Sequence, residues 1–292
     1  MLRIWLPEAS RTDMGRQEIY TNPVNWQSRA FNQVPDSDNR IHSDELAKAY
    51  GFTGALVPGV TVSCYLAHPA VEAWGLPWLE RGAAHVTVRS PLYDEHEFRV
   101  TVTPSENSCE AVLLSGGRVC AEGLISLPVM TPACPVQRSD IAMRANYVAP
   151  VASREVMEAF KAYGCPAKSF LWSADHEMAT YLREQSQMSS LHRTDEKAGS
   201  GGYANLSFVL GCANRHFAAV AKMSPWIHLE TWSQNFQSIP LGTELVSEMR
   251  VVNLFEKKGH EFADCEFNLF RADDGSCVCS ISQRAIYLMR EP

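Results

Sequence analysis

Residues 36–60, DSDNRIHSDELAKAYGFTGALVPGV, contain a histidine and several carboxylates that are suited to acid–base catalysis. His42 lies among polar residues, with Asp36 and Asp38 before it and Asp44 after it. A neutral imidazole beside a carboxylate can orient and deprotonate a water molecule and then return the proton to another atom. The segment is therefore a candidate catalytic loop, with His42 as general base or acid and Asp36 or Asp38 as its acidic partner.

The end of the same stretch is suited to binding an oxygen that gains negative charge. Pro58-Gly59 opens a long apolar run that is predicted to be helical. A glycine there lets a ligand approach the helix N-terminus, where the first backbone N–H groups have no acceptor within the helix. Such N–H groups near Gly59 and Val60 could stabilise an oxyanion. We therefore expect Pro58, Gly59 and Val60 beside the substrate.

The order of residues in this stretch resembles the MaoC-like dehydratases, the (R)-specific enoyl-CoA hydratase group of hotdog proteins. Their motif runs D-x-N-P-x-H-x-D, then an alanine, a Gly-Phe pair, and a [HP]-G pair that opens the central helix. The matching residues here are Asn39, Ile41, His42, Asp44, Ala47, Gly51, Phe52 and Gly59. The resemblance implies reversible hydration of a CoA-linked or carrier-linked acyl thioester, with no metal or cofactor, and with the catalytic histidine at His42.

Two positions depart from the family motif. The family's catalytic aspartate, five positions before the histidine, is Ser37 here, and the motif proline is Arg40. Either Asp36 or Asp38 takes the aspartate's role, or the hydration chemistry is weakened, altered or lost. Asn39 is expected to support the loop through side-chain to backbone hydrogen bonds. Arg40 is a candidate contact for the anionic cofactor tail, because guanidinium suits phosphate.

Other functions compete with hydration. Glu72 on the first apolar helix suggests thioester hydrolysis, since some hotdog thioesterases use a carboxylate on that helix; its simpler interpretation is a helix-end charge that reaches solvent. Ser37 in the aspartate position also fits a non-catalytic module that binds acyl-CoA. His42 alone could be a structural or surface histidine, and Asp44 is better explained as a favourable charge near a helix N-terminus.

Hydrophobic periodicity predicts the helices and strands around this segment. The run from Val60 to Trp74 is apolar nearly all round, which is typical of a buried helix. Pro69 inside it should kink the helix or free one carbonyl. Alternating apolar and polar residues predict antiparallel strands after it, at 85–90, 97–103, 109–115 and 118–127.

The second half repeats this plan. Residues 205–222 are predicted to form a mostly apolar helix, and the strands that follow it are predicted at 229–236, 243–253, 261–270 and 277–287. Between the halves, residues 127–140 contain three prolines, which is typical of a linker. We therefore predict two domains, 1–130 and 131–292.

A direct comparison of the halves supports an internal duplication rather than coincidence. With a shift of 148 positions, residues 64–78 align with residues 212–226, and six of the fifteen positions are identical, including His68 with His216. A helix that is apolar on all sides is buried only if a curved sheet wraps around it. The predicted fold is therefore α+β, a double hotdog, and the two histidines are expected to pack or to form hydrogen bonds inside it.

A segment with weak similarity to the candidate catalytic loop precedes the second predicted helix. Leu191-His192 is followed by Asp195 and by the glycine-rich residues 199–202. This stretch is either a degenerate counterpart that lines the acyl pocket or a flexible loop. Tyr203 is the residue there that we expect to contact substrate, with Asn205 and Arg215 nearby.

Composition limits the remaining possibilities. The net charge of -7 provides no general attraction for nucleic acid or anionic lipid, and no apolar run is long enough to span a membrane. The nine cysteines are interpreted as buried free thiols of a reducing compartment, for example Cys120, Cys265, Cys277 and Cys279. We thus expect a cytoplasmic protein whose partner is a small acyl thioester, neither nucleic acid nor membrane; a homodimer stays open.

Overall fold

The computed structural model describes residues 20–35, 52–195, 201–223 and 225–290. Its first half contains strand β1 (Trp26–Arg29), helices α2 (Gly59–Trp74) and α3 (Leu76–Arg81), and strands β2 (Ala83–Val88), β3 (Glu97–Pro104), β4 (Ser108–Ser115) and β5 (Arg118–Ser126). Its second half contains α4 (Arg154–Tyr163), β6 (Lys168–Leu171), α5 (Leu206–Val220), β7 (Ile227–Asn235), β8 (Glu244–Lys257), β9 (His260–Arg271) and β10 (Cys277–Leu288). Two 3₁₀ turns, Gln185–Gln187 and Ser190–His192, precede α5.

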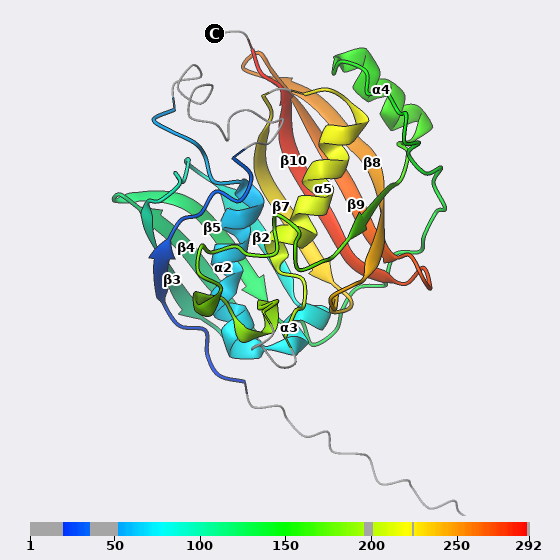
Figure 1. Ribbon diagram of the computed structural model, residues 1–292. Helices are drawn as coiled ribbons and strands as arrows, with labels where there is room; N and C mark the ends of the chain where they lie inside the picture. The colour runs from blue at the N-terminus through cyan, green and yellow to red at the C-terminus, as the bar shows by residue number, and fades with distance from the viewer. Residues whose placement is uncertain (1–19, 36–51, 196–200, 224, 291–292) are drawn as a thin grey trace, which may run out of the picture.

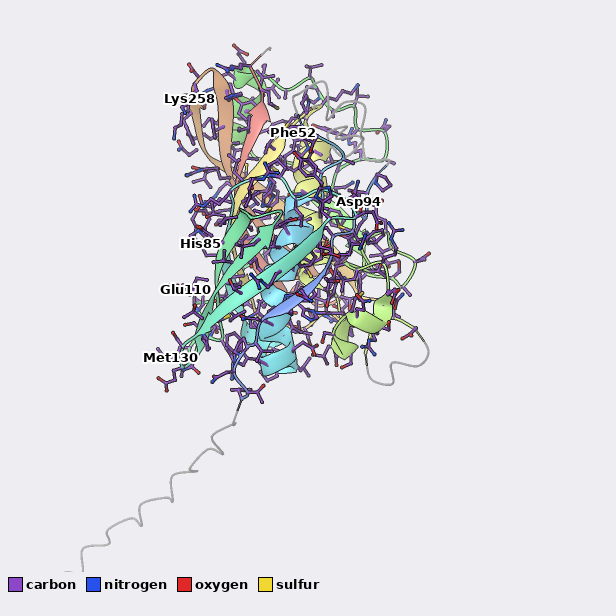
Figure 2. All side chains as sticks on the ribbon, turned by 90° about the vertical axis from the view of Figure 1, so that its left-hand side faces the viewer. Phe52, His85, Asp94, Glu110, Met130 and Lys258 are labelled. Atoms are coloured by element: carbon purple, nitrogen blue, oxygen red, sulfur yellow. The ribbon has the colours of Figure 1, made fainter. Side chains whose placement is uncertain are left out.

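All ten strands form one antiparallel sheet whose order mirrors the duplication. The order is β1-β3-β4-β5-β2-β7-β10-β9-β8-β6, so the two halves meet where β2 pairs with β7. Read outward from that pair, each half presents its strands in the same succession. The sheet curls around α2 and α5, which lie against its inner face (Figure 1). His85 and Glu110 lie on the opposite, outer face (Figure 2).

The two long helices are buried because they are apolar on most sides. Tyr65 and Leu66 on α2, and Phe208 and Phe217 on α5, are completely buried. The helices also touch each other between the halves, where Thr61 Oγ1 lies 3.1 Å from Ser207 Oγ. Both hydroxyls donate to the side-chain oxygen of Gln33. The core is thus continuous across the junction, and its polar atoms there are bonded to each other.

Pro69 has the predicted effect of freeing a carbonyl without ending the helix. It lies inside α2, where it has no N–H to donate to the carbonyl of Tyr65. That oxygen instead accepts a hydrogen bond of 3.1 Å from Nε1 of Trp26 on β1. The ring of Trp26 also packs against His68 in a tilted arrangement, with 4.0 Å between ring centroids. The proline therefore helps to fasten an edge strand to the central helix.

Backbone contacts repeat with nearly the shift found in the sequence. The N–H of Val57 donates to the carbonyl of Leu92, and 147 residues later the N–H of Ala204 donates to the carbonyl of Ile239. The predicted duplication therefore has a counterpart in the backbone, with an offset of 147 rather than 148 at these positions.

The two apolar helices and all eight predicted strands are confirmed, with ends that shift by a few residues. The short elements α3, α4 and β6 were not predicted. α4 does carry a local signal, because Ser153 caps it by accepting from the N–H of Val156. The predicted linker 127–140 contains neither helix nor strand, and the predicted domain boundary at 130/131 lies within it. Within the described residues, every helix is too short or too polar to cross a membrane.

Candidate active site

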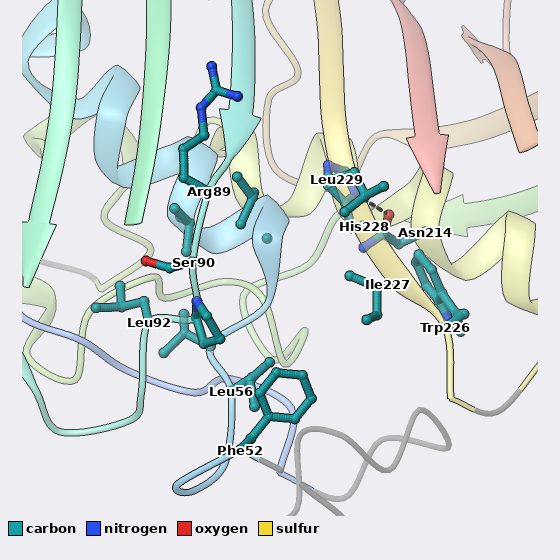
Figure 3. Close-up of a pocket in the computed structure, with 15 residues that line it drawn as sticks. Phe52, Leu56, Arg89, Ser90, Leu92, Asn214, Trp226, Ile227, His228 and Leu229 are labelled. Carbon is teal, nitrogen blue, oxygen red and sulfur yellow. Dashed lines mark hydrogen bonds between the residues drawn. The ribbon is translucent and has the colours of Figure 1, made fainter. Parts of the chain in front are cut away.

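A cavity of about 170 Å³ lies between the two halves at the start of α2. One wall comes from the first half and includes Ser90 and Leu92; the other comes from the second half and includes Asn214 and His228 (Figure 3). The described residues that line it are Phe52, Leu56, Val57, Gly59, Val62, Val88, Arg89, Ser90, Pro91, Leu92, Asn214, Trp226, Ile227, His228 and Leu229. Most of them are apolar, so the cavity suits an apolar group with few polar atoms.

The N-terminus of α2 opens onto this cavity without a side-chain cap. Pro58 is the N-cap residue, and its side chain has no acceptor for the N–H groups of the first turn. The N–H groups of Thr61 and Val62 both donate to the carbonyl of Pro58, at 2.9 and 3.0 Å. The N–H groups before them precede the first intrahelical bond and point out of the helix end. Together with the helix dipole, this end favours an oxygen that carries negative charge.

The second half supplies a histidine that packs directly on this helix end. A Cβ added to Gly59 would lie 3.2 Å from Cδ2 of His228, so glycine permits the close approach of the imidazole ring. His228 Nδ1 lies 3.1 Å from Oδ1 of Asn214 on α5, and its Nε2 is hydrogen-bonded to the hydroxyl of Thr231. Burial lowers the pKa of His228 to about 4, so the ring is neutral near pH 7.

The other polar side chains in the lining are turned to other partners. The Ser90 hydroxyl donates to the carbonyl of Val119 at 2.7 Å. Arg89 donates two hydrogen bonds to Glu122, at 2.9 and 3.1 Å, and its guanidinium extends away from Phe52 (Figure 3). Among the described lining residues, the polar atoms available to a ligand are therefore concentrated around Gly59 and Asn214.

The predicted site residues fall into two groups. His42, Asp36, Asp38, Asn39 and Arg40 lie outside the described residues, and their roles stay predictions. Pro58, Gly59 and Val60 are described: Gly59 lines the cavity, while Pro58 and Val60 are buried next to it. Phe52, the last matching residue of the motif before Pro58-Gly59, is also in the cavity wall. Both Phe52 and Gly59, from the described part of the motif, thus line one cavity.

Tyr203 and Glu72 do not lie at this cavity. Tyr203 precedes α5, where its carbonyl is 3.1 Å from Nδ1 of His192. Glu72 is exposed on the last turn of α2, which agrees with a helix-end charge that reaches solvent. His216 has the hydrogen-bonding role expected of it, at 2.8 Å from both Ser247 Oγ and the Pro166 carbonyl.

The counterpart of the cavity in the other half is nearly closed. It lies at the start of α5 and has a volume of about 10 Å³. Trp78 lines it as Trp226 lines the larger one, and Ile239 takes the place of Leu92. The remaining described residues that line it are Leu79, Ala204, Leu206, Val209, Asn235, Gln237 and Ser238. Of these two equivalent places, the described residues leave more space at the start of α2, the helix that follows the MaoC-like motif.

Within the residues described, no three His, Cys, Asp or Glu side chains group as metal ligands would. The nine cysteines are all free, and all but Cys134 are buried, as predicted for Cys120, Cys265, Cys277 and Cys279. What the described residues offer is a hydrogen-bonding surface within an apolar cavity.

Comparison of the sequence with protein-family models and with curated proteins finds no match. Comparison of the structure finds similar solved structures. One is a conserved hypothetical protein from Mycobacterium tuberculosis with a double hotdog fold; it has a TM-score of 0.58 and 11% identity, over 90% of this chain and 96% of that one.

Two further neighbours are named as dehydratases. A MaoC domain protein dehydratase from Chloroflexus aurantiacus has a TM-score of 0.55 and 10% identity, over 92% of this chain and 96% of that one. The dehydratase domain of PpsC from Mycobacterium tuberculosis, solved with C12:1-CoA, has a TM-score of 0.52 and 12% identity, over 90% of this chain and 93% of that one.

These likenesses extend over nearly the whole chain and agree with the strand order and the two wrapped helices. The chain therefore has a double hotdog fold, as the sequence predicted. Proteins of the predicted MaoC-like group are among its structural neighbours.

Proposed function

We propose that this protein binds an acyl thioester in the cavity at the start of α2 and adds water to, or removes it from, the acyl group. The observation that carries the proposal is the uncapped N-terminus of α2 in a mostly apolar cavity whose wall contains Phe52 and Gly59. Both residues belong to the stretch that resembles the MaoC-like motif. The fold of two structural neighbours named as dehydratases supports the same class of reaction.

In this proposal the thioester carbonyl oxygen faces the first turn of α2. When water adds to an enoyl thioester, its hydroxyl joins the β-carbon and a proton joins the α-carbon, while negative charge develops on the thioester oxygen. Backbone N–H groups at Gly59 and Val60 stabilise that charge, and the helix dipole acts in the same direction. The apolar lining excludes water around the acyl group, which strengthens these interactions.

The proton transfers are assigned to the segment that precedes Phe52. His42 acts as general base for water and as acid toward the α-carbon, with Asp36 or Asp38 as its partner. Asn39 supports the loop, and Arg40 contacts the phosphates of a CoA or carrier tail. This assignment is supported by the order of these residues in the motif.

The direct test is hydration of enoyl-CoA substrates of several chain lengths, followed by loss of the enoyl absorbance. We expect turnover by the wild type and a loss of about 10²-fold or more in His42→Ala, the usual magnitude for a general acid–base group. His260→Ala, at the start of β9 and outside the cavity lining, is the matched control. Full activity in His42→Ala would contradict the assignment, and no turnover with any substrate would contradict hydration.

One other function is favoured by a specific feature of the chain. Ser37 stands where the family has its catalytic aspartate, which fits a module that binds acyl-CoA without converting it. Tight binding of acyl-CoA by a wild type that shows no turnover would favour this module. Release of free thiol in the same samples would instead indicate hydrolysis, and Glu72→Gln would then test the carboxylate on α2.

A further inference from the structure

Asn214 on α5 differs from the other polar residues in the cavity. Its amide oxygen is hydrogen-bonded within the protein, whereas its amide nitrogen is available to a ligand. Its Oδ1 is 3.1 Å from His228 Nδ1. Its amide nitrogen has no partner within the described part of the chain, and Figure 3 shows that nitrogen turned away from His228. The side chain lines the cavity, so an amide donor faces the space into which a ligand would enter.

The orientation of this amide defines the tautomer of His228. An amide oxygen only accepts, so Nδ1 of the ring must carry the proton. Nε2 is then unprotonated and accepts from the hydroxyl of Thr231. The ring is neutral because burial lowers its pKa to about 4, and both of its nitrogens are occupied. Thr231 and His228 therefore hold the oxygen of Asn214, which leaves its nitrogen to donate.

A β-bulge in β7 makes this contact possible. β7 pairs with β10 through Glu230↔Arg284 and then His228↔Ala285, so Leu229 is an extra residue in the ladder. In a regular strand, residues three apart point to opposite faces. The bulge turns His228 to the same buried face as Thr231, which brings ring and hydroxyl together. Where β2 pairs with β5, from Ala83↔Ser126 to Val88↔Ala121, the register runs without such a shift.

The halves also differ in what they place opposite each other's helix ends. Asn214 and His228 face the start of α2. In the sequence alignment, the residues 148 positions earlier are Leu66, which is completely buried, and Glu80, which is exposed. The sequence alignment therefore does not repeat the polar pair, which lies at the cavity of about 170 Å³.

We propose that Asn214 donates a hydrogen bond from its amide nitrogen to the carbonyl oxygen of the bound acyl thioester, and that His228 and Thr231 are positioning residues that hold this donor. The inference rests on the proposed function and adds to it a contribution from the second half. The thioester oxygen would then receive N–H groups from α2 and from α5. Both halves are needed for one site, although only the first carries the motif.

The test compares steady-state hydration of an enoyl-CoA and binding of a saturated acyl-CoA by calorimetry in the same variants. We expect Asn214→Ala to lower kcat by about 10²-fold or more with a smaller change in KM, because a donor to developing charge acts chiefly in the transition state. Asn214→Asp keeps the acceptor for His228 but replaces the donor with a negative charge, and should lose as much. It provides a second, nearly isosteric variant if the alanine variant fails to fold.

His228→Gln and Thr231→Val test positioning. Each should lower kcat by less than Asn214→Ala, and a double variant with Asn214→Ala should lose little more than Asn214→Ala alone, because the residues act through one amide. Gln237→Ala, which removes an amide from the small second cavity, is the matched control and should retain wild-type kinetics.

The outcomes separate this inference from the proposed function. An active wild type with unchanged kcat in both Asn214 variants overturns the role of Asn214 but leaves hydration in place. A wild type without turnover overturns hydration; in that case the Kd of the saturated acyl-CoA tests the donor. A Kd that is at least threefold weaker in Asn214→Ala then supports the contact, and an unchanged Kd overturns it.

Discussion

The N-termini of α2 and α5 are equivalent in the duplicated fold, but only that of α5 has a side-chain cap. Pro58 leaves α2 without a side-chain cap, and the cavity beyond it has a volume of about 170 Å³. Asn205 caps α5 by accepting from the N–H of Phe208 at 3.1 Å, and the cavity there is about 10 Å³. One helix end is therefore exposed to a ligand and the other is satisfied by the protein.

At the N-terminus of α5, both the oxygen and the nitrogen of the Asn205 side chain form hydrogen bonds. Asn205 is completely buried, and its Nδ2 donates to the carbonyls of Met178 and Ala179, at 2.9 and 3.2 Å. These bonds tie the segment before the 3₁₀ turns to the helix. In a duplicated fold, one helix N-terminus can therefore contribute to stability while the equivalent one is left to bind a ligand. Unsatisfied N–H groups are costly in the first case and useful in the second.

The largest effect is expected from closing the open end. Gly59→Val places a branched side chain where even a Cβ would be 3.2 Å from the ring of His228. We expect hydration activity to fall by about 10²-fold, since a displacement of about 1 Å in such a site costs that much. Enoyl-CoA turnover measures the effect.

Leu206→Val, at the first position of α5, is the matched control. It should cost stability of about 1 kcal/mol but leave activity within about twofold. Equal loss of activity in both variants would show that the two helix ends are not functionally different.

An intermediate effect is expected from opening the closed end. Asn205→Ala removes the cap and leaves buried carbonyls without their donor, so we expect the free energy of unfolding to fall by about 2 kcal/mol. Activity of the remaining folded protein should change little, because Asn205 does not line the open cavity. Urea unfolding followed by circular dichroism measures the loss.

Pro58→Ala, at the N-cap of α2, breaks no side-chain hydrogen bond and should cost less than about 1 kcal/mol. If Pro58→Ala proved as destabilising as Asn205→Ala, the contrast between a capped and an uncapped end would be wrong.

The smallest effect is the pH dependence of stability due to two histidines at equivalent positions, His68 on α2 and His216 on α5. Burial lowers the pKa of each to about 4, from an ordinary value of 6.5. Between these pH values the unfolded chain takes up protons that the folded chain does not bind. Stability should therefore fall as the pH drops below 6.5, by less than about 1 kcal/mol for each histidine at pH 6, and the loss grows toward pH 4.

His216→Gln and His68→Gln should each make this dependence shallower, which urea unfolding at several pH values would reveal. The effect should be larger for His216, which is completely buried, than for His68, which is half-buried. An unchanged slope in His216→Gln would mean that this histidine is protonated in the folded protein.

The described part of the candidate site was only partly predictable. Gly59 could be found from Pro58-Gly59 ahead of an apolar run, because helix starts have a local signature. His228 and Asn214 had no comparable signal. Their contact depends on a bulge at Leu229 and on two segments meeting across the junction of the halves. Tyr203 was predicted to contact substrate by analogy between the halves, but it lies at the closed end.

The two buried helices, the eight principal strands and the duplicated fold could be predicted from the amino-acid sequence, because they follow from periodicity along short segments. The open helix end and the polar side chains that face it could be identified from the three-dimensional structure alone. Those features depend on burial, on strand register and on packing between residues far apart in the chain, such as Gly59 against His228. Side-chain patterns specify what can be buried, whereas the space left at a junction depends on how both halves pack.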